Sequence, residues 1–129
     1  MLKLNDDTLL ERRSYVGGRW TETPSIFSVN NPSDGSVVAQ VADMGIEELR
    51  AAIDAAYGAQ KAWAAKTAIE RADLLMKWHA LIIANQDDLA RILTAEMGKP
   101  LAEARGEIAY GAGYIRWFAE EARRTYGDI

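Results

Sequence analysis

Residues 95–108 read AEMGKPLAEARGEI and contain Lys99, the first side chain to consider as a catalytic group. A lysine acts as a nucleophile where burial or a nearby positive charge lowers its pKa. Lys99 lies between Gly98 and Pro100, in a turn that water normally reaches. The spacing therefore predicts an ordinary surface lysine at a corner between two helices.

The remaining reactive side chains form no catalytic group. The chain contains one histidine, His79, and no cysteine, which excludes a thiol nucleophile, a disulfide and a zinc–thiolate site within it. His79 follows Trp78 in an amphipathic pattern with no serine nearby, so we interpret it as structural. Most glutamates have Lys or Arg neighbours at helical spacing, as on a solvated face. We therefore predict no catalytic and no cofactor-binding residue in this chain.

Residues 110–115, YGAGYI, contain a Gly-x-Gly pattern, but a phosphate-binding loop needs a strand before it and a helix starting on it. Here the glycines lie inside a helical pattern, where each costs about 1 kcal/mol relative to alanine. A helical wheel separates two faces of this helix. The face that carries the glycines could pack closely against another helix or could form the wall of a cavity. The first face is Leu101, Ala104, Ile108, Ile115 and Ala122; the second is Gly106, Tyr110, Gly113 and Trp117.

Two regions of different pattern must position these side chains. Residues 1–44 predict a short helix in LNDDTLLERR and two β-hairpins, which turn at Gly17-Gly18 and at residues 31–35 and could share one sheet. Residues 45–129 have helical periodicity and predict four helices. The fold class predicted is α/β, with two small antiparallel β units followed by about four helices, and the chain itself is mainly helical.

The helix boundaries follow from capping signals. The first helix starts after Gly45 and has roughly 18 residues. Thr67 and Glu70 have capping-box spacing for the second helix, which runs to about residue 84. The third helix stops at Gly98, and Pro100 suits the first turn of the fourth. The fourth is predicted to run to residue 126 and to end at Gly127.

Composition limits the partners. A formal net charge of −4 argues against nucleic acid, because binding to phosphates needs a basic surface. The opening residues lack an apolar run of signal-peptide length, and no later segment approaches a membrane span. We therefore predict a cytoplasmic protein with no nucleic-acid or membrane partner.

Four segments carry a more specific signal in their order: YVGGRW, VNNPSDGSVVAQVADMG, AIDAAYGAQKAWAAKTAIERADLLMKW and EMGKPLAEARGEIAYGAGYIRWFAEEARRTYGD. Together they resemble the start of NAD(P)-dependent aldehyde dehydrogenases. The Asn-Pro-x-x-Gly turn and the Glu-x-Gly-Lys-Pro-Leu corner are the specific parts. The opening and closing residues are most similar to the succinate-semialdehyde dehydrogenase branch.

The resemblance implies that residues 1–129 are an N-terminal fragment of the cofactor-binding domain, with 1–44 and 45–129 as its parts and the catalytic domain absent. The full-length enzyme would oxidise an aldehyde such as succinate semialdehyde through a cysteine thiohemiacetal, with NAD or NADP, as a homo-oligomer. Its nucleophilic cysteine and cofactor contacts lie downstream in the family, so this fragment alone would be inactive and bind no cofactor. The alternative is a stand-alone helical interaction module without catalysis.

The resemblance also implies two groups of site residues. The inward positions of the helix after Gly-Lys-Pro match Gly106, Tyr110 and Gly113, which would line the substrate tunnel of the full-length enzyme. A monovalent cation would be held by the backbone carbonyls of Val29 and Asn30 and by the side chain of Glu96. Oxygen ligands of this kind suit a hard cation. Local capping or pairing of Glu96 is the alternative.

Overall fold

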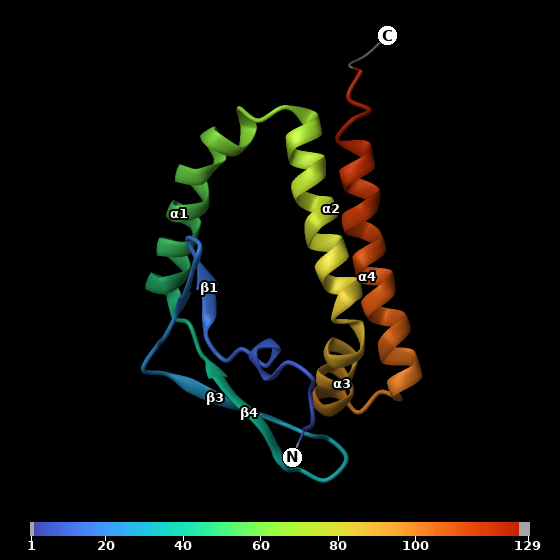
Figure 1. Ribbon diagram of the computed structural model, residues 1–129. Helices are drawn as coiled ribbons and strands as arrows, with labels where there is room; N and C mark the ends of the chain where they lie inside the picture. The colour runs from blue at the N-terminus through green and yellow to red at the C-terminus, as the bar shows by residue number, and fades with distance from the viewer. Residues whose placement is uncertain (1, 127–129) are drawn as a thin grey trace.

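A computed structural model describes residues 2–126 and confirms the predicted fold class of two small antiparallel strand pairs followed by four helices (Figure 1). A short 3₁₀ helix, η1, precedes them where the short helix was predicted. The elements are η1 (Asp7–Leu9), β1 (Ser14–Val16), β2 (Arg19–Thr21), β3 (Ile26–Asn30), β4 (Val37–Ala42), α1 (Ile46–Ala64), α2 (Ala68–Ala84), α3 (Gln86–Met97) and α4 (Leu101–Glu121).

The two hairpins form separate two-stranded sheets, β1–β2 and β3–β4, so they do not share one sheet. Gly17 and Gly18 have φ of 58° and 81°. Positive φ at both central residues is the requirement of the type I′ turn, whose twist matches that of a hairpin. One backbone hydrogen bond links the two hairpin regions: the N–H of Ala42, at the end of β4, donates to the carbonyl of Arg12, before β1, over 2.8 Å.

Helix α2 begins as its sequence predicts. The backbone N–H of Glu70 donates to Oγ1 of Thr67 over 3.2 Å, and the backbone N–H of Thr67 donates to the Glu70 carboxylate over 2.7 Å. These reciprocal bonds complete a capping box and satisfy amides that the helix leaves without partners. The box thus marks the start of α2, directly after the turn that follows α1.

The corner between α3 and α4 also follows the prediction. Gly98 closes α3 with a left-handed φ of 77°, and its N–H donates to the carbonyl of Thr94 over 2.9 Å. Pro100 is the N-cap of α4, so the first helical residue is Leu101 rather than the proline. The corner turns α4 back along α3 and α2, and the three helices pack together.

Helix α4 ends at Glu121, earlier than the predicted residue 126. The backbone N–H groups of Arg123 and Arg124 bond to carbonyls three residues back, which tightens the chain into a turn. The Arg123 guanidinium also donates to Asp73 of α2 over 2.6 Å, which holds this turn against α2. The predicted cap, Gly127, lies outside the described residues.

The core between the elements is made of small side chains. No large side chain of residues 2–126 is fully buried, and none of the described residues of α1 is buried. In Figure 1, α2 and α4 run side by side while α1 stands apart. No helix of the described residues is long and apolar enough to cross a membrane. The buried apolar residues are Ala39, Ala72, Ala90, Ala104, Ala112 and Ala119.

Candidate functional site

Helix α4 has one buried and one open face. Ala104, Ala112 and Ala119 are 0–1% exposed, on a helix that packs against α2 and α3. A Cβ placed on Gly106 or Gly113 would meet no atom within 4 Å. The glycines of the predicted second face therefore make no close helix packing within the described residues. This arrangement argues against close packing, and the cavity wall stays a prediction.

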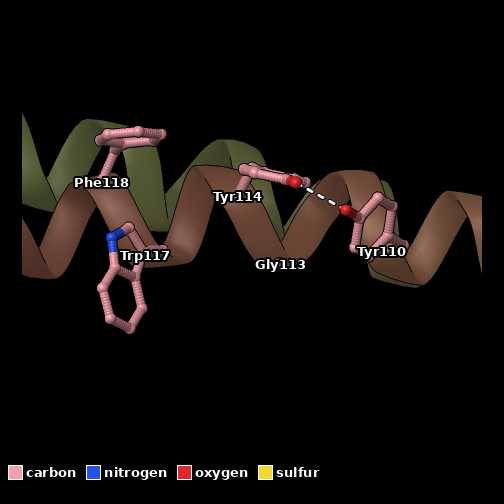
Figure 2. A pocket seen from close by; sticks show the side chains of 5 residues that line it. All are labelled: Tyr110, Gly113, Tyr114, Trp117 and Phe118. Atoms are coloured by element: carbon pink, nitrogen blue, oxygen red, sulfur yellow. Dashed lines mark hydrogen bonds between the residues drawn. The ribbon is translucent and has the colours of Figure 1, made fainter.

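Aromatic side chains surround a shallow groove of about 400 Å³ on this open face. Figure 2 shows Gly113 between Tyr110 and Trp117, so the missing side chain of the glycine leaves the floor free. The groove thus brings together two of the three predicted tunnel residues, Tyr110 and Gly113. The complete lining is Tyr110, Gly113, Tyr114, Trp117 and Phe118.

The third predicted tunnel residue, Gly106, lies in an adjoining hollow of about 350 Å³ that shares Tyr110 with the groove. Lys99 lines this hollow too, and its ammonium forms an ion pair with the carboxylate of Glu107. The side chain of Lys99 is only 20% exposed, which corrects the prediction of an ordinary surface lysine. The Lys99 ammonium is therefore held by a carboxylate of α4 instead of pointing freely into the hollow.

The hydroxyls of Tyr110 and Tyr114 lie 2.6 Å apart and share a hydrogen bond, and the rings meet edge to face with centroids 5.0 Å apart (Figure 2). The hydrogen bond with Tyr114 raises the pKa of Tyr110 above its ordinary value. Tyr110 therefore stays protonated at neutral pH. It can offer a ring face and a hydroxyl to a ligand, but it does not act as a base.

The predicted cation ligands come from two elements that contact each other, α3 and β3. Val29 is half-buried, and the strand register is irregular between Val29 and Asn30. Glu96 lies exposed in the last turn of α3. Residues 2–126 contain no cluster of three or more His, Cys, Asp or Glu side chains that could hold a metal ion. A site of two carbonyls and one carboxylate stays a prediction.

His79 is half-buried on α2, and its Nδ1 atom is buried without a hydrogen-bond partner among the described residues. It lines neither of the two hollows on α4. The interpretation of His79 as a structural residue is unchanged.

Sequence analysis missed Tyr114 and Phe118 as groove residues. The signal was available: Tyr114 stands four residues after Tyr110, and Phe118 four after Tyr114, a spacing that stacks side chains along one helix. The helical wheel followed steps of four and three residues and assigned Tyr110 and Trp117, but not Tyr114 or Phe118, to this face.

Known proteins match this chain over nearly its whole length. The model of the "Aldehyde dehydrogenase family" matches residues 20–129. The chain is 50% identical over 130 residues to 3-sulfolactaldehyde dehydrogenase of Pseudomonas putida. This match covers 99% of the chain and 27% of that protein. It is 54% identical over 121 residues to mitochondrial succinate-semialdehyde dehydrogenase of Homo sapiens. This match covers 94% of the chain and 23% of that protein.

Solved structures agree. An aldehyde dehydrogenase from Brucella melitensis biovar abortus 2308 superimposes with a TM-score of 0.97 at 53% identity, over 99% of this chain and 27% of that one. PnpE in complex with nicotinamide adenine dinucleotide gives a TM-score of 0.88 at 28% identity, over 93% and 25% of the two chains. The chain thus spans about a quarter of the length of these relatives, as the resemblance to their N-terminal portion predicts.

Proposed function

Because the chain belongs to the aldehyde dehydrogenase family, we propose that it forms the N-terminal portion of an enzyme that oxidises an aldehyde to a carboxylate with NAD or NADP. The substrate class is an aldehyde such as succinate semialdehyde, because succinate-semialdehyde dehydrogenases are among its relatives at 54% identity. The reaction would proceed through a thiohemiacetal on a cysteine supplied outside these residues, since this sequence has none.

The structural observation that supports this proposal is the open face of α4. Gly106, Tyr110 and Gly113 lie along two adjoining hollows, with free space above both glycines. This arrangement supports a role as one wall of a substrate tunnel, in which glycine leaves width and Tyr110 supplies an aromatic surface. The wall contributes shape rather than acid–base chemistry, because the pKa of Tyr110 is raised and Lys99 is paired with Glu107.

The same proposal covers the domain, the location and the assembly. Residues 1–129 would belong to the cofactor-binding domain, which closes against a catalytic domain in a cytoplasmic homo-oligomer. The exposed apolar side chains of α1, among them Leu49, Ile53 and Tyr57, support this, since such surfaces are normally covered by protein. They equally favour the second candidate, a helical interaction module that binds another protein without catalysis.

One experiment separates the two candidates. The native protein is isolated, its mass is measured, and aldehyde-dependent formation of NADH or NADPH is followed by absorbance with and without a thiol-alkylating reagent. A mass several times that of 129 residues, with turnover that alkylation abolishes, is the expected result. A native mass equal to that of this chain, with no turnover in any preparation, would favour the interaction module.

A further inference from the structure

The N-terminal arm, residues 2–21, is held to the start of α3 by one carboxylate, that of Asp88. Its Oδ2 atom accepts the backbone N–H groups of Asn5 and Asp6, both over 2.9 Å. Its Oδ1 atom accepts from Nδ2 of Asn5 over 3.0 Å. Both oxygens are therefore used, by residues 82 and 83 positions away in the sequence.

Asp88 is buried to 3% exposure, and within residues 2–126 it is the only buried polar or charged side chain. It makes no ion pair with any described residue. A buried charge without a cation must be compensated by hydrogen bonds, and those from N–H groups to a carboxylate are among the stronger ones. Its place in the first turn of α3 also favours a negative charge. The arm thus supplies the donors that the buried carboxylate requires.

The arm connects elements that do not pack on one another. The carbonyl of Arg12 accepts from the N–H of Ala42 over 2.8 Å, and a Cβ on Gly17 would lie 3.7 Å from Cβ of Ala55 in α1. Helix α1 makes no extended contact with any other element of the described residues. Figure 1 shows the arm running from the α3 end to the β1 strand beside α1.

We propose that Asp88 is a latch for the N-terminal arm: its three hydrogen bonds keep the arm seated, and their loss frees it from α3 while α2, α3 and α4 stay packed. These three helices contact one another directly, so we expect the release to be local. The latch makes the position of the β1–β2 hairpin beside α1 depend on a side chain at the start of α3.

The test is amide hydrogen exchange of the full chain, read by NMR at Asn5 and Asp6. Asp88→Asn keeps the shape but puts an NH₂ group where an acceptor oxygen stood, so one donor loses its partner. Exchange at these two amides should become at least about tenfold faster, with α4 amides unchanged. Asp87→Asn is the matched control, because Asp87 is exposed in the same turn and pairs with Arg105 over 2.7 Å. It should leave the arm unchanged.

Equal exchange in Asp88→Asn and in the unaltered chain would overturn the proposal, as would the same acceleration in Asp87→Asn. If Asp88→Asn also exposes the α4 amides, Asn5→Ala becomes the deciding variant. That change removes only the bond from Nδ2 to Oδ1. It must accelerate exchange at Asp6 with α4 protection intact, and an unaltered rate there would equally overturn the latch.

Discussion

Gly98 packs directly against Pro32: a Cβ placed on Gly98 would lie 2.9 Å from Cγ of the proline. Gly98 closes α3, whereas Pro32 belongs to the turn between β3 and β4. The two corners that carry the family pattern therefore meet in space, although they are far apart in the sequence. Their contact fixes the strand pair against the corner from which α4 starts.

Gly98→Ala should destabilise the chain by about 2 kcal/mol or more, since a left-handed φ costs alanine about 1–2 kcal/mol and the new methyl group meets Pro32. Chemical denaturation measures the loss. Gly35→Ala is the control, because Gly35 has a φ of 72° with nothing within 4 Å and should show the backbone cost alone. In a Pro32→Ala background, the cost of Gly98→Ala should fall; equal costs in both backgrounds would contradict the steric explanation.

Glu11 should titrate far below an ordinary glutamate. Hydrogen bonds from the Arg13 side chain and backbone lower its pKa from 4.5 to about 2. Because the folded value lies below the unfolded one, the stability that Glu11 contributes is complete above about pH 4.5 and is lost as the pH falls towards 2. An NMR titration of its carboxyl carbon measures the midpoint.

The matched variants for this titration are neighbours in the sequence. Arg13→Ala should raise the midpoint of Glu11 towards its ordinary value. Arg12→Ala should not, because Arg12 contacts Glu11 through its backbone N–H, which the change retains. A midpoint near 4.5 in the unaltered chain would show that the pair does not persist in solution.

In the complete enzyme that we propose, Gly106→Leu should fill the hollow beside Tyr110 and lower kcat/KM by about tenfold, with cofactor affinity unchanged. Steady-state kinetics and a separate cofactor titration measure the two effects. Gly111→Leu is the matched control, because Gly111 lies on the same helix but lines neither hollow. If Gly106→Leu left kcat/KM unchanged, α4 would not line the tunnel.

The chain studied by itself should self-associate, because its large apolar side chains face solvent instead of a core. Ile53→Glu tests the part played by α1. Ile53 is 58% exposed, so the change should alter the free energy of unfolding by less than about 0.5 kcal/mol while it reduces association. Sedimentation velocity follows the association. A monomer at every concentration, with a high melting temperature, would contradict the prediction.

The predicted cation should raise the melting temperature of the complete enzyme when potassium or sodium replaces a bulky organic cation at equal ionic strength. Glu96→Gln should reduce this shift, because it removes the charged ligand. Glu103→Gln, an exposed glutamate in the first turn of α4, should leave the shift unchanged. Equal shifts in all three proteins would argue for a general salt effect.

The local elements were predictable because their signals lie within a few residues of each other. Gly17-Gly18 specifies a two-residue turn, and Thr67 with Glu70 specifies the start of α2. The groove was predictable in part, because Tyr110 and Gly113 share a helix face that periodicity reveals.

What the sequence did not reveal depends on partners distant in the chain. Asp88 has the pattern of an ordinary acidic residue in the first turn of a helix. No residue near it in the sequence indicates that Asn5 will donate hydrogen bonds to its carboxylate. Likewise the pairing of Lys99 with Glu107 requires the angle of the corner, which sequence spacing does not define. Tertiary contacts of this kind override local interpretation.

The alanine core has a consequence for mutagenesis. Truncation to alanine, the usual way to find the residues that hold a fold together, has nothing to remove at Ala72, Ala104, Ala112 or Ala119. Enlargement is the informative change: valine or leucine at these buried positions should displace the packed helices, at about 1–3 kcal/mol each. Tolerance to substitution should therefore be the reverse of that in a common globular core: the bulky residues should tolerate replacement, and the buried alanines should not.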